Sequence, residues 1–195
     1  MTKEEFAGLF DEYMSAKRDE MRSKFDRVLP SGEYIFNRFD KNEYLGFGKG
    51  SSIYDTSVVM GDVEVGDKVW VGPYTLLDGS AAKLKIGNFV SIDSGVMIYT
   101  HDSTKYYVSG GVDSFVSGGV TIGDYVVIGT MSMIGCGVTI GDHCVIGAHS
   151  FVNKDVPSNS IVAGNPAKII GEVIIKDDGG AEFKYFNNSS VPERE

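Results

Sequence analysis

The sequence has few of the residues that crosslink a chain or anchor it in a membrane. Its 195 residues include two cysteines, Cys136 and Cys144, one tryptophan, Trp70, and three histidines. Two cysteines provide neither a disulfide framework nor a zinc knuckle, so we expect a reducing, cytoplasmic setting. No segment approaches the roughly 20 apolar residues of a membrane span, and no signal peptide is visible. The net charge of −9 disfavours nucleic acids and anionic membranes as partners.

A six-residue repeat is the dominant feature of the second half of the chain. Its aliphatic positions are Ile122, Ile128, Ile134, Ile140, Ile146 and Val152. Two places ahead of each stands a small or β-branched residue: Val120, Val126, Ser132, Val138, Cys144 and Ser150. Alternate side chains of a strand share a face, so both sets point inward. This period predicts a β-helix of hexapeptides, in which three hexads make one coil and residues 18 apart stack.

The corners and the interruptions of the repeat lead to two further predictions. Glycine follows five of the six aliphatic residues, which predicts a positive φ at these corners. The hexads recur upstream, but the step from Leu77 to Ile86 is nine residues, so three extra residues should bulge near 79–82. Between Ile98 and Ile122 the chain leaves the repeat, which predicts a protruding loop over about 99–115. Such loops often carry function.

The rest of the chain divides into appendages around this repeat. Residues 1–50 should form a helix over 3–28, which braces an open end of the β-helix, and then a linker. Residues 51–170 form the β-helix. Residues 171–195 should form a short β-hairpin and a disordered tail from 187 onward. The expected fold class is all-β, with one N-terminal helix and one C-terminal hairpin.

The end of the repeats carries a family resemblance. The runs Lys154-Asp-Val-Pro157 and Ala163-Gly-Asn-Pro-Ala-Lys168, together with the histidine-bearing loop, resemble the hexapeptide-repeat acyltransferases. The likeness is greatest to the galactoside, maltose and xenobiotic acetyltransferases and to those of surface-polysaccharide clusters, and covers roughly residues 53–170. It implies a left-handed parallel β-helix that forms a homotrimer and binds acetyl-coenzyme A between neighbouring solenoids. An apolar face around Trp70 would be covered in such a trimer.

Two residues are candidates for catalysis. The resemblance implies that a histidine of the protruding loop acts as general base, and His101 is the histidine in that loop. An imidazole with a pKa near 6.5 can remove a proton from a sugar hydroxyl at neutral pH and return it to the departing thiol. The repeat places Asp78 beneath Tyr99, near the root of this loop. Asp78 could orient His101 or bind the acceptor, or it could simply bond the local backbone.

Five residues are candidates for holding the cofactor, all by position in the resemblance. Thr130 and Ala148 fall where relatives offer backbone groups to the pantetheine arm. Asn153, Lys154 and Lys168 fall near the end of the solenoid, where lysines can anchor the phosphates of a polyanion. Each lysine could equally be an ordinary solvated side chain.

These observations favour an enzyme that transfers acetyl from acetyl-coenzyme A to a sugar hydroxyl, for saccharide or surface-polysaccharide modification. The alternative acceptor is a nucleotide-linked amino sugar. A zinc carbonic anhydrase is a poorer fit, because His143 and His149 lie six residues apart at separate corners and cannot converge within one subunit. We therefore expect no metal. A non-catalytic scaffold would need neither the histidine loop nor the terminal lysines.

Overall fold

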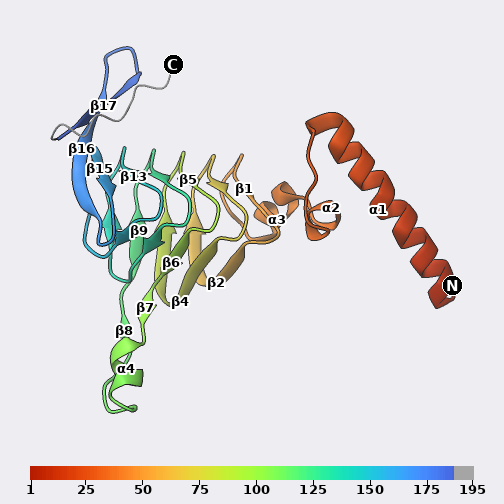
Figure 1. The fold of residues 1–195 in the computed structure, drawn as a ribbon, viewed down its shortest axis with the longest axis horizontal. Coiled ribbons are helices and arrows are strands. Elements are labelled where there is room, and N and C mark those ends of the chain that lie inside the picture. The colour runs from red at the N-terminus through yellow and green to blue at the C-terminus, as the bar shows by residue number, and fades with distance from the viewer. Residues whose placement is uncertain (187–195) are drawn as a thin grey trace.

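The described part of the chain, residues 1–186 of the computed structural model, is a β-helix with helices at one end and a hairpin at the other (Figure 1). The expected tail from 187 onward lies outside these residues. The helices are α1 (Lys3–Phe25), α2 (Gly32–Ile35), α3 (Arg38–Tyr44) and α4 (Thr104–Val108). The strands are β1 (Ser52–Ile53), β2 (Val58–Val65), β3 (Trp70–Val71), β4 (Leu76–Ile86), β5 (Ser91–Ile92), β6 (Met97–Tyr99), β7 (His101–Asp102), β8 (Val116–Ser117), β9 (Val120–Ile122), β10 (Val127–Ile128), β11 (Met133–Ile134), β12 (Thr139–Ile140), β13 (Val145–Ile146), β14 (Phe151–Val152), β15 (Ser160–Ala163), β16 (Lys168–Ile175) and β17 (Ala181–Tyr185).

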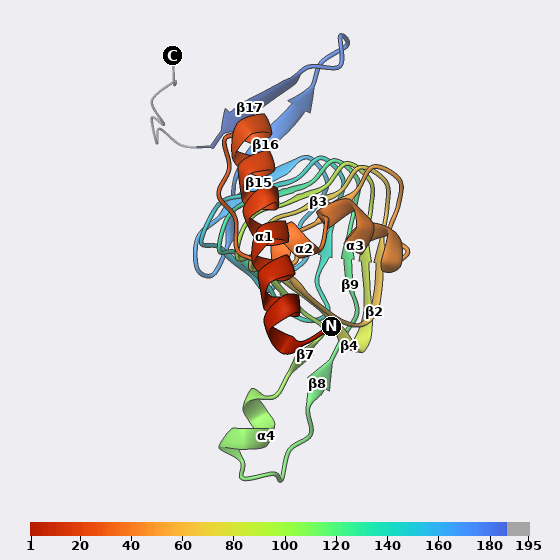
Figure 2. The same cartoon turned by 90° about the vertical axis from the view of Figure 1, so that its right-hand side faces the viewer.

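The coils stack into three parallel faces. The first face contains β1, β3, β5, β10, β13 and β15. The second face contains the starts of β2 and β4 and then β6, β11 and β14, whereas the third face contains the ends of β2 and β4 and then β9 and β12. Ile122 pairs with Ile140, Ile128 with Ile146 and Ile134 with Val152, as the 18-residue coil predicts. Figure 2 shows the same coils nearly end-on.

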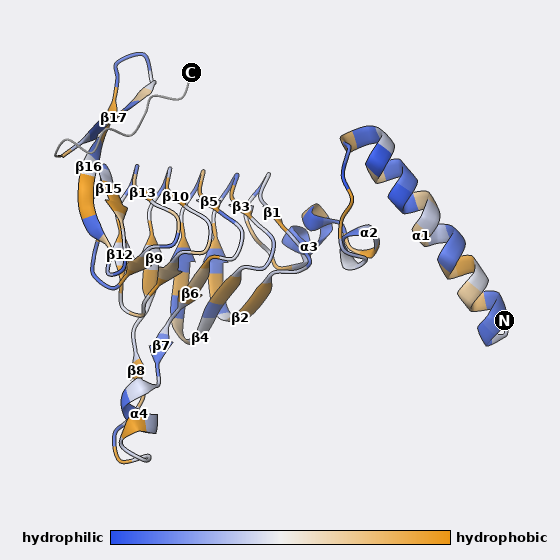
Figure 3. Cartoon of the chain, viewed as in Figure 1, coloured by the Kyte–Doolittle hydropathy of each residue, from blue (hydrophilic) through white to orange (hydrophobic). Residues whose placement is uncertain are grey.

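Both inward sets of the repeat form the core. The isoleucines from Ile122 to Ile146 are at most 1% exposed, and the set two residues earlier is buried as well. Burying an aliphatic side chain of this size contributes about 1.5–3 kcal/mol. The polar members are hydrogen-bonded, since the hydroxyls of Ser132 and Ser150 both donate to the carbonyl of Gly147. Figure 3 shows hydrophobic residues following the strands of the coils.

The expected reason for the corner glycines is wrong. The positive φ falls two residues after each glycine, on Tyr125, Met131, Gly137, His143 and His149. Four of the five glycines, all except Gly135, are instead required by the close approach of coils. A Cβ at Gly129 would lie 2.7 Å from the backbone nitrogen of Ala148, and one at Gly147 would lie 2.9 Å from the Cβ of Ala163.

The corner between the third and first faces places non-glycine residues in the left-handed region. Phe89, Tyr125 and His143 all have φ between 55° and 59° there, and Lys68 precedes them with 57°. Their rings stack along the corner, with centroids 5.6 Å apart from Phe89 to Tyr125 and 4.7 Å apart from Tyr125 to His143. Such stacking contributes about 0.5–1.5 kcal/mol per pair and offsets part of the backbone strain.

A ladder of polar side chains accompanies this aromatic stack. Asp67 Oδ1 accepts from the amide of Lys49, Asn88 Oδ1 from Asp67, and Asp124 Oδ1 from Asn88. The ladder continues as Asp142 Oδ1 accepts from Asp124, and Ser158 Oγ from Asp142. Each of these side chains therefore accepts a hydrogen bond from a backbone amide of the preceding coil.

At the N-terminal end, the structure corrects two predictions, the irregular linker and the helix that braces the open end. Residues 33–50 are not an irregular linker, because they contain most of α2 and all of α3, and α3 packs against β1. The Lys41 ammonium of α3 donates to the carbonyls of Tyr54, Asp55 and Ser57, which closes the first coil. The long helix α1 packs mainly against α2 and lies clear of the coils (Figures 1 and 2). It ends three residues before the expected boundary.

At the C-terminal end, antiparallel strands follow the parallel coils. β16 pairs antiparallel with β15 and with β17, so the hairpin extends the first face as a mixed sheet. Residues 1–186 contain four helices beside the strands, so the all-β detail of the predicted class is not confirmed. No helix within residues 1–186 has the length and apolarity needed to cross a bilayer.

Candidate functional site

The protruding loop leaves the corner between the second and third faces. After β6, the chain forms β7, the short helix α4 and then β8, which returns to β9. His101 pairs with Ser117 and Asp102 with Val116, so the root of the loop is a two-residue antiparallel ribbon (Figure 1). The hexad pattern could predict neither this ribbon nor α4, because both lie outside the repeat. Paired backbone at its root gives His101 a defined position.

The structure brings His101 and Asp78 together. Asp78 pairs with Tyr99 across neighbouring coils, and its Oδ2 lies 3.2 Å from Nδ1 of His101. The Asp78 side chain is fully buried, whereas that of His101 is 36% exposed. The contact is a close approach of the two groups, and within residues 1–186 neither of these two atoms has a hydrogen-bond partner. The second oxygen, Oδ1, accepts from the amide of Ser80 at 2.9 Å.

This geometry suits a general base. A buried carboxylate is costly unless it is paired, and the facing imidazole nitrogen is its natural partner. A proton on Nδ1, directed at Asp78, leaves Nε2 free to accept one from a substrate. The ring of Tyr99 contacts that of His101 edge-on, at 6.2 Å between centroids, and limits its rotation. Asp78 thus both bonds the local backbone and faces His101, two of the three roles that the sequence left open.

Two other carboxylates near the loop have different partners. Asp102 Oδ1 accepts from the amide of Thr104 at 2.7 Å, at the start of α4. Hydrogen bonds from the Thr104 side chain and backbone lower the pKa of Asp102. Asp93 Oδ1 accepts from the hydroxyl of Ser91. Asp78 is therefore the carboxylate that faces the histidine.

The cofactor candidates lie on two different edges of the second face. Thr130 and Ala148 are exposed at the corner of the first and second faces, one coil apart, and the carbonyl of Thr130 accepts from His149. Lys168 begins β16 and pairs with Ala163, beyond the same corner. Asn153 and Lys154 follow β14 and are exposed at the opposite edge, the corner from which the His101 loop leaves. One subunit therefore does not gather all five residues.

An apolar column on the outside of the second face was missed from the sequence. Its members pair coil by coil and are Val58, Leu76, Met97, Met133 and Phe151. The equivalent outward column of the third face is polar, with Glu64, Lys85, Thr121 and Thr139. The sequence does contain this column, because each of its apolar residues stands one position before an inward residue. Trp70 lies elsewhere, on the first face, half-buried with its ring edge-on to Tyr54.

The remaining histidines do not assemble into a metal site. His143 stacks on Tyr125 at the aromatic corner, and His149 is exposed beside Ala148 at another corner. No group of three or more potential His, Cys, Asp or Glu ligands converges within the part of the chain that the structure describes.

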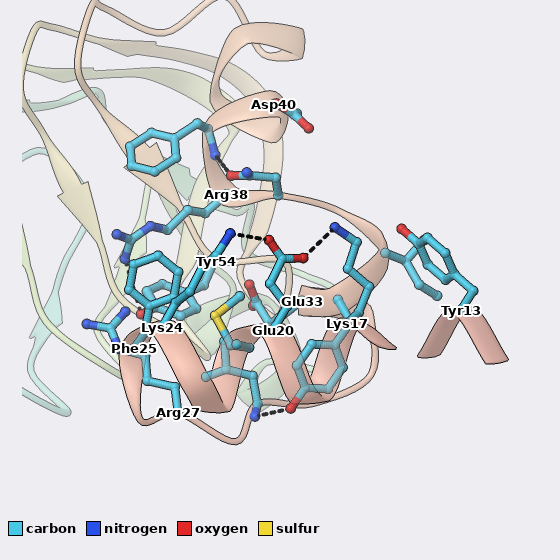
Figure 4. A pocket seen from close by; sticks show the side chains of 16 residues that line it. Tyr13, Lys17, Glu20, Lys24, Phe25, Arg27, Glu33, Arg38, Asp40 and Tyr54 are labelled. Carbon is cyan, nitrogen blue, oxygen red and sulfur yellow. Dashed lines mark hydrogen bonds and ion pairs between the residues drawn. The ribbon is translucent and has the colours of Figure 1, made fainter. Parts of the chain in front are cut away.

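A cavity of about 660 Å³ lies at the opposite end of the solenoid from β17, between α1 and the segment containing α2 and α3 (Figure 4). Glu20 binds the ammonium groups of Lys17 and Lys24 along its wall. None of the residues predicted to act in catalysis or cofactor binding lines this cavity. Its walls come from the appendage rather than from the coils that position His101.

Comparison with known proteins identifies the repeat. The family model described as "Bacterial transferase hexapeptide (six repeats)" matches residues 119–154. Protein YrdA of Escherichia coli is 35% identical over 156 residues, which cover 74% of this chain and 84% of that protein. UDP-3-O-acylglucosamine N-acyltransferase of Methylobacterium sp. strain 4-46 is 31% identical over 135 residues, 66% of this chain. The chain spans only 37% of the length of that relative.

Solved structures with a similar fold include proteins crystallised with coenzyme A or its acetyl ester. A hexapeptide-repeat-containing acetyltransferase from Vibrio cholerae, in complex with acetyl-coenzyme A, is 26% identical with a TM-score of 0.61, covering 83% of this chain and 87% of its own. A mutant of AntD, an N-acyltransferase from Bacillus cereus, in complex with dTDP and coenzyme A, is 25% identical with a TM-score of 0.60, covering 65% and 72%.

Proposed function

Because the chain belongs to the hexapeptide-repeat acyltransferase superfamily, we propose that it transfers an acyl group from a coenzyme A thioester, acetyl in the simplest case, to the amino group of a nucleotide-linked amino sugar. The observation that carries this proposal is the contact between His101 and the buried carboxylate of Asp78. The amine acceptor is supported by the N-acyltransferases among the similar proteins. They favour it over the sugar hydroxyl that the sequence first suggested.

The chemistry of an amine acceptor matches this pair. An amine must lose a proton as it attacks the acyl carbon, and Nε2 of the partly exposed His101 side chain takes that proton. The thioester supplies the activated acyl carbon: its carbon–sulfur bond breaks as the carbon–nitrogen bond forms. The Asp78 carboxylate, 3.2 Å from Nδ1, faces the imidazolium that results. His101 then returns the proton to the departing thiolate.

The direct test is an acceptor screen. The purified chain is incubated with acetyl-coenzyme A and either UDP- or dTDP-linked amino sugars, and thiol release and the acylated product are measured. Matched nucleotide sugars with a hydroxyl in place of the amine form the control set. Amide formation supports the proposal, acylation of the hydroxyl sugars alone replaces the acceptor, and no release with any acceptor rejects the proposal.

The lysine anchors lead to a kinetic prediction. Lys154→Ala and Lys168→Ala should each raise the Michaelis constant for acetyl-coenzyme A more than they lower turnover, because phosphate contacts are remote from the reacting carbonyl. A well-formed charged contact contributes about 1.5–3 kcal/mol, or roughly 10- to 150-fold in affinity. Steady-state kinetics and calorimetry with coenzyme A measure the effect, with Lys176→Ala in the hairpin as control. If both variants bind coenzyme A with unchanged affinity, Lys154 and Lys168 are ordinary surface residues.

The two separated edges lead to a prediction about assembly. Thr130 and Ala148 lie on one edge of the second face, and Lys154 and the His101 loop lie on the other. We propose a closed homotrimer of left-handed β-helices in which edges of neighbouring subunits meet, with the apolar column of the second face covered. Met133→Glu should then dissociate it, as measured by light scattering at micromolar concentration.

The third face supplies the matched control for this experiment. Thr121→Glu introduces the same charge at the equivalent outward position of a polar column, so the trimer should persist. A wild-type monomer would contradict the prediction, and so would a Met133→Glu variant that keeps the mass of the trimer. The cytoplasmic setting inferred from the two cysteines stays a prediction.

A further inference from the structure

The extra residues in β4 lie directly beneath the histidine loop. Gly61 of β2 pairs with Gly79 of β4, but Val63 pairs with Leu84, so β4 holds three more residues than β2 at this corner. The sequence predicted this insertion from the nine-residue step. We call residues 80–83 the insertion. Its first amide, that of Ser80, donates to Oδ1 of Asp78.

Thr100 connects the insertion to the loop. Its side chain is fully buried, and its Oγ1 accepts from the amides of Ala81 at 3.4 Å and Ala82 at 3.3 Å. Its carbonyl accepts from Gly118 at 3.0 Å, where the loop returns to the coil. Thr100 thus holds three pieces of backbone together: the insertion below, its own segment between β6 and β7, and the returning strand.

We infer that Thr100 is a positioning residue for the acyl transfer, acting through the insertion to hold the Asp78 carboxylate against Nδ1 of His101. The inference rests on the proposed function, because it assumes that His101 is the base. Three successive amides, those of Ser80, Ala81 and Ala82, bond to Asp78 and Thr100. The same backbone segment that fixes the carboxylate is therefore anchored by the residue that immediately precedes the base.

The physical argument concerns the freedom of the corner. Most corners of the coil stack hold glycine after the inward residue, because a Cβ there would meet the next coil. The position after Leu77 instead carries Asp78, at a corner lengthened by the insertion in its own coil and by the loop in the next. Longer connections have more conformations available, so this corner needs side-chain bonds that the regular corners do not.

The test compares two substitutions of the same residue. Thr100→Val keeps the shape but removes the acceptor of the two amides, whereas Thr100→Ser keeps the acceptor. We expect Thr100→Val to lower kcat by about 10- to 100-fold, because small misplacements at a reacting centre have effects of this size. The Michaelis constant for acetyl-coenzyme A should stay within about twofold, and Thr100→Ser should restore most of the turnover.

A matched control separates positioning from folding. Ser51 is also buried, and its hydroxyl accepts from the amide of Val69; Ser51 lies two coils before the coil that carries the loop. Ser51→Ala should affect thermal stability but not kcat. A Thr100→Val variant with turnover within twofold of wild type would overturn the inference, as would a Thr100→Ser variant as impaired as Thr100→Val.

Crystal structures of the Thr100 variants provide a readout that does not depend on activity. The contact between Asp78 and His101 should be lost in Thr100→Val and kept in Thr100→Ser. If the wild-type protein acylates no acceptor, the proposed function fails, and these structures still show whether Thr100 holds the pair. If the wild type is active and the contact survives in Thr100→Val, the inference alone fails.

Discussion

Replacing His101 with alanine should lower turnover by about 10²–10⁴-fold while coenzyme A still binds, the range typical for a positioned general base. The reason is the position of this side chain at the root of the loop, with Nδ1 against Asp78 and part of the ring exposed. Single-turnover kinetics measure the loss, and calorimetry with coenzyme A measures binding. The fold should be unchanged, because the side chain lies outside the core.

His143→Gln is the matched control for this prediction. It removes another histidine, one that stacks on Tyr125 at the aromatic corner, and should leave turnover within a few-fold of wild type. Turnover of His101→Ala at that same level would reject the general base. Acetyl-cysteine trapped on Cys136 or Cys144 would replace it with covalent transfer. The structure disfavours that route for Cys144, since burial raises the pKa of its thiol.

Asp78→Asn should be almost as damaging to turnover, with a loss of about 10²–10⁴-fold. The amide keeps the shape and can still accept from Ser80 through its oxygen. Its NH₂ would then face Nδ1 of His101 and donate to it, which moves the ring proton to Nε2, the atom that must act as base. The Michaelis constant for acetyl-coenzyme A should change little.

Stability distinguishes this effect from unfolding. Asp78 is fully buried, and removing a buried charge avoids its desolvation cost, so the melting temperature should not fall. Asp93→Asn is the control, because that carboxylate accepts from Ser91 and does not contact His101. Normal turnover in Asp78→Asn would show that the carboxylate only serves the local backbone.

The repeat made the coils predictable because each hexad is constrained locally. An inward position such as Ile128 must pair with Ile146 whatever the rest of the chain does. The insertion before Ile86 could be located for the same reason, as a step of the wrong length. From the pairing of Leu77 with Ile98, the sequence could also place Asp78 near the root of the loop. The fold and the candidate pair of His101 and Asp78 could thus be predicted from the spacing of the repeat.

Other features depended on contacts between coils, which counting does not reveal. The left-handed residues Tyr125 and His143 break the usual preference for glycine, because their rings stack on neighbours that are distant in sequence. The helices α2 and α3 form where the open coil needs a cover, and their segment shows no long helical period. The ribbon of β7 and β8 lies outside the repeat, and its pairing depends on where the loop returns.

The polar ladder from Asp67 to Ser158 gives the solenoid a direction of growth. Each rung accepts from an amide of the preceding coil and offers its own amide to the following one. A nascent chain that has completed one coil thus presents a ready-made template for the next. Each position of the ladder requires only a short side chain that can accept a hydrogen bond. Whole 18-residue coils can therefore be duplicated or deleted in evolution without changes in the neighbouring coils. The solenoid can thus gain coils while the corner that holds His101 and Asp78 stays unchanged.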